Sequence, residues 1–197
     1  MHSELPLAVL FDMDGTLVDT EGLWWQATGD IARSLGRELG PEDVPHVLGR
    51  AVEDTAAHLA PGDVPATARA LTDAFAARIS QGITLIPGAR RLLAALTARG
   101  IPTALVSASP RSIVEQVLPN LDGHRFHLVI AAEDTERGKP YPDPYLAATE
   151  RLGVSPADCV AIEDSPTGIA AATAAGCRVL VVDPDHGLPE FSAMSVS

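Results

Sequence analysis

Two acidic side chains follow the first apolar run of the chain. The stretch LAVLF at residues 7–11 is typical of a buried strand, and Asp12 and Asp14 come directly after it. In an extended chain, residues i and i+2 point to the same side, so both carboxylates are aimed at one place. Two carboxylates that close repel each other, which raises the pKa of one or calls for a positive charge between them. The pair therefore predicts a site that holds a proton or a cation.

Polar side chains of other types stand beside later apolar runs. Ser107 follows the run ALV, Glu163 and Asp164 end the run CVAIED, and Lys139 lies in the loop GKPYPDPY with Asp143 a few residues further on. Each of these residues alone has an ordinary explanation as a cap, a turn or a solvated group. Carboxylates suit a hard cation, however, and a lysine suits an anion such as phosphate. We expect Asp143 to cap its helix or to orient Lys139 rather than to touch a substrate.

The elements that must position these groups alternate along the chain from about residue 87. Helical patterns are predicted at residues 87–100, 110–118, 144–153 and 166–176, and strands at 101–109, 126–132, 159–164 and 178–182. Short apolar strands that alternate with helices indicate a parallel sheet covered on both faces. We therefore predict an α/β fold with a Rossmann-like, doubly wound core. The carboxyl ends of its strands meet at one edge, which brings the polar groups together.

Residues between the first strand and this alternating region have a different pattern. Three helix-like segments, at 23–39, 43–60 and 64–80, are separated by turn signals at Gly40–Pro41 and Pro61–Gly62. This predicts an all-helical cap domain at 19–83, inserted into a core domain made of 1–18 and 84–197. The cap then lies near Asp12 and Asp14, and we expect it to close over them with hinges at 18–20 and 82–86.

Serine–proline and aspartate–proline pairs recur where helices are predicted to begin. They are Ser109–Pro110, Asp143–Pro144, Ser155–Pro156 and Ser165–Pro166. Each pair is typical of an N-cap residue followed by proline in the first helical position. Several helix N-termini at one sheet edge predict a rim that favours anions.

The composition excludes several classes of partner. The 197 residues carry a net charge of −12, which argues against a broad nucleic-acid surface, and any anion site must be locally positive. No apolar stretch approaches the length of a membrane span. Cys159 and Cys177 form neither a disulfide framework nor a zinc pattern and are predicted to be small buried thiols. With no apolar leader, we expect a cytoplasmic protein, either a monomer or a weak homodimer.

The stretches FDMDGTLVDTE, VSAS, GKPYPDPYL and VAIEDSPTG occur in the order of the four motifs of the haloacid dehalogenase-like hydrolase superfamily. The resemblance covers the whole predicted core. The helical cap between the first two motifs resembles that of β-phosphoglucomutase-like proteins and small sugar phosphatases. The resemblance implies a Mg²⁺-dependent phosphatase that hydrolyses a small phosphorylated metabolite, such as a sugar or polyol phosphate, through an aspartyl-phosphate.

The resemblance also implies roles for residues of this chain. Asp12 is the expected nucleophile, and Asp14 the general acid and then the base. Ser107 and Lys139 are expected to bind the transferring phosphoryl group. Further donors to the phosphoryl group are expected from the backbone N–H groups of Met13, Asp14 and Ala108. The expected metal ligands are the carboxylates of Asp12, Glu163 and Asp164 and the backbone carbonyl of Asp14. Gly15 permits the tight turn after the strand, and Thr16 braces the loop.

Other chemistries of the superfamily fit this sequence less well. Dehalogenases and phosphonate hydrolases lack an acid at the position of Asp14, and the latter use a cap lysine, whereas residues 19–83 contain none. A phosphomutase is the alternative, since Arg50 lies close to where such enzymes carry a cap arginine, although Val52 aligns there by eye. A protein that binds phosphometabolites without turnover is a second alternative. Candidate substrate contacts in the cap are Trp24, Gln26, Arg50 and Glu53, although packing within the cap or against the sheet is the first expectation for Trp24.

Overall fold

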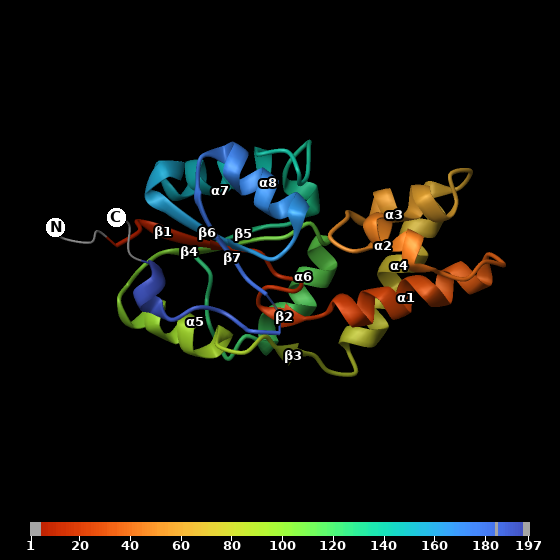
Figure 1. The fold of residues 1–197 in the computed structure, drawn as a ribbon, viewed down its shortest axis with the longest axis horizontal. Helices are drawn as coiled ribbons and strands as arrows, with labels where there is room; N and C mark the ends of the chain where they lie inside the picture. Colours follow the sequence, from red (N-terminus) through yellow and green to blue (C-terminus); the bar gives the residue numbers. More distant parts are fainter. Residues whose placement is uncertain (1–4, 184, 195–197) are drawn as a thin grey trace.

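The computed structural model describes residues 5–183 and 185–194, and the outer ends of the predicted core ranges lie outside the described residues. Its centre is a five-stranded sheet in the order β5-β4-β1-β6-β7, with every neighbouring pair parallel. The strands are β1 (Ala8–Phe11), β4 (Thr103–Val106), β5 (Leu128–Ile130), β6 (Cys159–Glu163) and β7 (Arg178–Val181). All five were predicted from the sequence, and the α/β, Rossmann-like fold class is confirmed (Figure 1).

Helices cover both faces of this sheet (Figure 1). On one face lie α7 (Asp143–Leu152) and α8 (Pro166–Ala175), and on the other lie α5 (Ala89–Ala98) and α6 (Arg111–Val117). Alternate residues of each strand enter separate apolar clusters: in β1, Val9 and Phe11 belong to one cluster, and Ala8 and Leu10 to the other. Burial on both faces explains why these strands are continuous apolar runs rather than alternating ones.

The register of the sheet aligns the strand ends that carry polar residues. Phe11 is the partner of Leu105 on one side and of Ile162 on the other. Asp12, Ser107 and Glu163 therefore follow at nearly the same level along three adjacent strands. The sheet edge predicted from the sequence is formed by this register.

The inserted segment forms a helical cap beside the end of the sheet (Figure 1). Its long helices, α1 (Glu21–Ser34) and α4 (Val64–Ile79), pack against each other, and Trp24 meets Phe75 edge to face with ring centroids 5.3 Å apart. The cap is helical throughout, as predicted. The domain boundaries at 18/19 and 83/84 stay a prediction.

The middle helix of the cap was predicted wrongly as one segment over 43–60. The structure has a 3₁₀ turn η1 (Pro41–Asp43), a single turn α2 (Val44–Val47) and a separate helix α3 (Val52–Leu59). The chain leaves the helical conformation at Leu48, whose ψ is 135°, and turns at Gly49, whose φ is +66°. A φ in that range favours glycine, so the sequence GR at 49–50 ends the helix. The resulting loop points its backbone towards the core.

A short antiparallel pair of strands, which the sequence did not predict, lies where the chain enters and leaves the cap. β2 (Val18–Asp19) pairs with β3 (Thr84–Leu85), so the two predicted hinge segments are hydrogen-bonded to each other. Two-residue strands carry too little pattern to be recognised in a sequence. The pairing holds the two connections side by side.

Only one of the four predicted N-cap pairs is formed as expected. Ser165 accepts a hydrogen bond from the N–H of Gly168 at the start of α8. Pro110, not Ser109, occupies the N-cap of α6, and α7 begins at Asp143 itself without a side-chain cap. Ser155 precedes only a 3₁₀ turn, η4 (Pro156–Asp158). The side chains of Ser109 and Asp143 are used elsewhere, as described below, which is why they do not cap.

The remaining short elements complete the surface of the core. They are η2 (Leu118–Asn120), η3 (Ala132–Asp134) and η5 (Phe191–Met194). Cys159 and Cys177 are buried free thiols, and burial raises their pKa values to about 11 and about 12. No helix in the described part of the chain combines the length and apolar character that a membrane span requires.

Candidate active site

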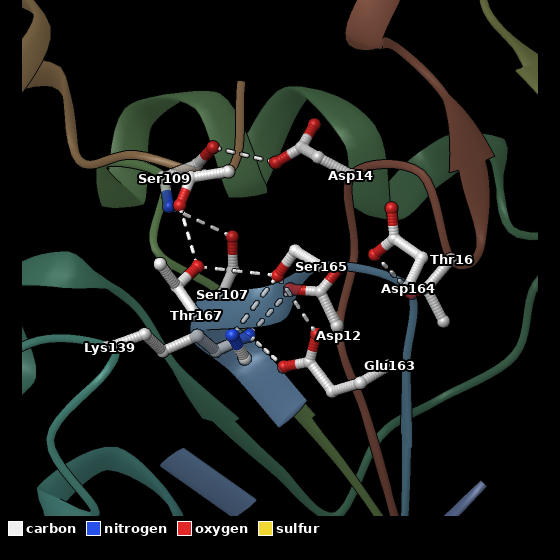
Figure 2. A network of polar contacts seen from close by, with 12 residues as sticks. Asp12, Asp14, Thr16, Ser107, Ser109, Lys139, Glu163, Asp164, Ser165 and Thr167 are labelled. Atoms are coloured by element: carbon white, nitrogen blue, oxygen red, sulfur yellow. Dashed lines mark hydrogen bonds and ion pairs between the residues drawn. The ribbon is translucent and has the colours of Figure 1, made fainter. Parts of the chain in front are cut away.

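A buried ion-pair network joins the ends of β1 and β6 to the loop after β5. The Nζ of Lys139 lies 2.6 Å from Oδ1 of Asp12 and 2.5 Å from Oε1 of Glu163. Burial opposes the charge on Lys139, but the two carboxylates outweigh it and hold the pKa of the ammonium above its ordinary value. The site therefore holds an ammonium group between two carboxylates (Figure 2).

Three carboxylates of this network lie close enough to share a cation. Oxygen atoms of Asp12, Glu163 and Asp164 lie within 4.8 Å of one another. Burial, followed by the charge of Asp12, raises the pKa of Asp164 to about 8, and burial raises that of Glu163 to about 7 against the pull of Lys139. An all-oxygen set under this mutual repulsion has the chemistry that a hard divalent cation prefers.

The turn after β1 fits closely around Asp164. Gly15 has a φ of +82°, and a Cβ at this position would lie 2.2 Å from Oδ2 of Asp164. Thr16 donates a hydrogen bond of 2.9 Å from Oγ1 to Oδ1 of the same carboxylate. The motif DGT thus both allows the approach of Asp164 and orients it, which agrees with the bracing expected of Thr16.

Asp14 is turned away from the other carboxylates and is held by two hydroxyl groups. Thr20 donates to Oδ1 over 2.5 Å and Ser109 donates to Oδ2 over 2.7 Å. Burial raises the pKa of Asp14, the bond from Thr20 opposes this, and the charge of Asp12 adds to it. The direction of this shift favours the protonated form of Asp14. Figure 2 shows its contact with Ser109, away from the Lys139 network.

Sequence reasoning missed three residues of this arrangement. Ser109 was assigned to a cap, and Thr20 was not singled out. Tyr145, on α7, is fully buried and donates a hydrogen bond of 2.5 Å to Oε1 of Glu163. The apolar spacing of α7 makes Tyr145 indistinguishable from a core residue, and only the fold brings its hydroxyl to the strand end.

Several donors face the space between Asp12, Lys139 and the loop after β4. Ser107 is buried, and its Oγ accepts a bond of 3.0 Å from the N–H of Ser109. The backbone N–H groups of Met13, Asp14 and Ala108 donate no hydrogen bond to any of the described residues. These N–H groups could therefore donate to an anion, and their binding of a phosphoryl group stays a prediction.

A cavity of about 60 Å³ lies between these groups and the cap. Asp12, Asp14 and Lys139 line its floor, and Trp24 and Arg50 are among the cap residues that line its roof. Trp24 is 8% exposed and donates its indole N–H to the carbonyl of Val47 over 2.8 Å. Trp24 therefore packs within the cap and also lines the cavity, and its contact with a substrate stays a prediction.

Other predicted contacts lie outside this cavity. Gln26 accepts a hydrogen bond from Arg78 on the cap surface. Glu53 lines a neighbouring groove, which shares Ser107, Ala108 and Lys139 with the site. Asp143 neither caps α7 nor orients Lys139, since both its oxygens accept bonds of 3.0 Å from Arg137. The expectation for Asp143 was wrong because the guanidinium group of Arg137 binds both oxygens of its carboxylate.

One contact ties the loop of the cap directly to the rim of the core. Thr167, in the first turn of α8, donates a hydrogen bond of 2.7 Å to the carbonyl of Gly49. A Cβ on Gly49 would lie 3.2 Å from the Cβ of Ser165. The loop that ends α2 therefore rests on the N-terminus of α8 and encloses the cavity.

Comparisons with known proteins agree with this geometry. Residues 6–176 match the family model described as haloacid dehalogenase-like hydrolase. Hexitol phosphatase B of Escherichia coli K12 is 36% identical over 184 residues, which cover 89% of this chain and 83% of the relative. Hexitol phosphatase A of the same organism is 34% identical over 192 residues, which cover 95% of this chain and 88% of the relative.

A solved structure shows the same arrangement of chain. A mutant of CbbY from Rhodobacter sphaeroides, in complex with xylulose-1,5-bisphosphate, superposes with a TM-score of 0.82 at 30% sequence identity. The match covers 90% of this chain and 86% of that chain. The likeness therefore extends over the sheet and the cap together.

Proposed function

Because the chain belongs to the haloacid dehalogenase-like hydrolase family of enzymes, we propose that it is a Mg²⁺-dependent phosphatase that acts on a small phosphorylated metabolite through an aspartyl-phosphate. The observation that carries this proposal is the pairing of Asp12, 2.6 Å from Lys139, with a second acid, Asp14, on the same cavity. One acid can act as nucleophile beside a fixed positive charge while the other handles the proton.

In the first step, a carboxylate oxygen of Asp12 attacks phosphorus and the bond from phosphorus to the leaving oxygen breaks. Asp14 gives its proton to that leaving oxygen, so the product departs as a neutral alcohol. The raised pKa of Asp14 supports this role, since it favours the protonated form before attack. Lys139, Ser107 and the free N–H groups of the β1 and β4 loops stabilise the charge on the phosphoryl oxygens.

In the second step, Asp14 is a carboxylate and takes a proton from water. The water oxygen bonds to phosphorus, the acyl-phosphate bond to Asp12 breaks, and inorganic phosphate leaves with the Asp12 carboxylate regenerated. Thr20 and Ser109 hold both oxygens of Asp14 and so fix where its proton is given and taken. The closed cap limits the water that can reach the first step.

Mg²⁺ fits the donors present. Asp12, Asp164 and the carbonyl of Asp14 would hold it, with Glu163 contributing a carboxylate that also binds Lys139. Bound there, the cation would reduce the repulsion between nucleophile and phosphate. The raised pKa values of Asp164 and Glu163 support a requirement for positive charge at this position.

Sugar or polyol phosphates are the proposed substrate class. The hexitol phosphatases and the bisphosphate-bound CbbY structure support phosphorylated carbohydrate chains as ligands of this fold and cap. The cavity supports the same class, because Trp24 presents an aromatic face and charged groups stand beside it. The cytoplasmic location and the monomeric or weakly dimeric state stay predictions.

The test is turnover of p-nitrophenyl phosphate with MgCl₂, followed by release of inorganic phosphate. We expect Asp12→Asn to lower activity about a thousandfold or more. The control Asp19→Asn changes an exposed residue of β2 and should keep the wild-type activity. We expect EDTA to abolish turnover and MgCl₂ to raise the melting temperature of the wild type but not of Asp164→Asn.

The alternatives give different results in the same assay. A phosphomutase would convert a sugar monophosphate to its isomer with little release of phosphate. A binding protein would be stabilised by phosphate without turning over any ester. Either outcome would overturn the proposed phosphatase.

A further inference from the structure

Glu21 lines the cavity beside Asp14, and the proposed reaction gives it no role. It is the first residue of α1 and is half-buried between the core and the cap. No hydrogen bond or ion pair reaches its carboxylate from any side chain or backbone group in the described ranges 5–183 and 185–194. Thr20, the residue before Glu21, donates a hydrogen bond to Asp14, and Glu21 and Asp14 line the same cavity. Burial, and after it the charge of Asp14, raises the pKa of Glu21.

The other charged groups that line the cavity already have partners. Lys139 is bound by two carboxylates, and Asp14 by two hydroxyl groups. Arg50 donates its Nε to the carbonyl of Pro45 over 2.9 Å. Most of the remaining wall is apolar, formed by Trp24, Leu48, Val52 and Phe75. Glu21 is therefore a hydrogen-bond acceptor on the cavity wall that receives no donor from the described residues.

The position of Glu21 limits which part of a substrate it can meet. Asp14 is the proposed proton donor to the leaving oxygen, so the atoms next to Asp14 belong to the carbon chain just beyond the ester. A carboxylate at that point is stabilised by hydroxyl donors and is repelled by another carboxylate.

Building on the proposed phosphatase, we propose that Glu21 is a specificity-determining residue that accepts hydrogen bonds from the hydroxyl groups nearest the phosphoester. It thereby selects neutral polyhydroxylated leaving groups, such as alditols and sugars. It disfavours short phosphorylated acids, whose carboxylate would lie against its own.

The experiment compares three substrates on the purified full chain: sorbitol 6-phosphate, 2-phosphoglycolate and p-nitrophenyl phosphate. Glu21→Gln removes the charge and keeps the shape, Glu21→Ala removes the acceptor, and Glu42→Gln, on the exposed cap surface, is the matched control. Melting temperatures with and without MgCl₂ are recorded for every variant.

We expect Glu21→Gln to lower kcat/KM for sorbitol 6-phosphate about tenfold, and Glu21→Ala at least as much, because each loses a charge-assisted hydrogen bond. The same variants should change p-nitrophenyl phosphate turnover less than about threefold, since that ester has no hydroxyl beside the reacting oxygen. The ratio of 2-phosphoglycolate to sorbitol 6-phosphate turnover should rise at least about tenfold in Glu21→Gln. Glu42→Gln should behave as the wild type.

Other outcomes overturn the inference. If Glu21→Gln lowers all three activities equally, Glu21 supports the reaction itself and does not select the substrate. If it alters the MgCl₂ dependence of the melting temperature while the substrate ratios stay fixed, Glu21 acts on the metal. Loss of every activity in the wild type would instead contradict the proposed function, which distinguishes the two failures.

Discussion

Lys139 is the residue at which two acids of the site converge. Its ammonium group binds Asp12 and Glu163. The Nζ of Lys139 also lies 5.4 Å from the centroid of the Tyr145 ring, and the Tyr145 hydroxyl donates to the same Glu163. Buried charges of this kind are stable only when every partner is in place. We therefore predict that Tyr145 is a positioning residue, which fixes Glu163 and, through it, the lysine proposed to bind phosphate.

Replacing Tyr145 by phenylalanine tests this positioning. The ring still fills its place, but Glu163 loses a buried donor and Lys139 gains freedom to move. We expect kcat to fall about tenfold with KM nearly unchanged, because the loss concerns charge that develops in the transition state. Steady-state kinetics with p-nitrophenyl phosphate measure both constants.

The control is Tyr141→Phe, since the chain has two tyrosines and Tyr141 is 51% exposed. It should leave both constants as in the wild type. Equal kinetic constants for the two variants would contradict a positioning role for Tyr145. A fall in the melting temperature of Tyr145→Phe without a change in kcat would show that Tyr145 contributes to packing alone.

At the level of elements, the loop of the cap meets the first turn of α8 through one hydrogen bond. Thr167→Val removes the donor to the carbonyl of Gly49. A typical hydrogen bond contributes about 1 kcal/mol, so we expect the closed arrangement to weaken and KM to rise about fivefold, with kcat affected less. Initial rates over a range of substrate concentrations provide the measurement.

Thr173, exposed on the same helix, supplies the matched control. Thr173→Val makes the same chemical change away from the cap and should leave KM unaltered. If Thr167→Val behaves like Thr173→Val, the contact with Gly49 does not hold the cap closed.

His124 links two elements at the far end of the sheet. Its Nδ1 lies 3.1 Å from the hydroxyl of Thr97 on α5, and its Nε2 lies 2.9 Å from that of Thr103 on β4. Burial, and then His127, lower the pKa of His124 below 6.5. The folded state thus binds fewer protons here than the unfolded state, so this contribution to stability is present above the ordinary pKa and lost as the pH falls below it.

Thermal unfolding between about pH 7.5 and pH 5.5 tests that sign. We expect the melting temperature of the wild type to fall more steeply than that of His124→Asn, which has no proton to take up. The variant is less stable at the higher pH because it cannot bridge both threonines. Parallel curves for the two proteins would show that His124 does not contribute to the pH dependence.

For the whole molecule, the paired strands β2 and β3 join the cap to the core at both connections. Rotation about this pair would move the cap relative to the sheet and so change the overall dimensions. We expect small-angle scattering to show a smaller radius of gyration when MgCl₂ and orthovanadate, a phosphate mimic, are added. An unchanged scattering curve would contradict closure of the cap on the ligand.

Much of this protein could be predicted from its residues alone. Apolar runs that alternate with helical patterns determined the parallel sheet, because strands buried on both faces must be continuously apolar. The edge that collects Asp12, Ser107, Lys139 and Asp164 follows from the same topology, since parallel strands end on one side. Asp12, Ser107 and Asp164 lie at the strand ends, so their meeting needs only the sheet, whereas Lys139 reaches them from the longer loop after β5.

Tertiary structure decided the contacts that depend on distance across the fold. Ser109 and Thr20 reach Asp14, and Tyr145 reaches Glu163, because the register of the sheet and the packing of α7 bring them together. Asp143 turned to Arg137 for the same reason, against its predicted role. A side chain with several possible partners takes the one that the packed chain places nearest, and a local pattern of residues carries no record of that distance.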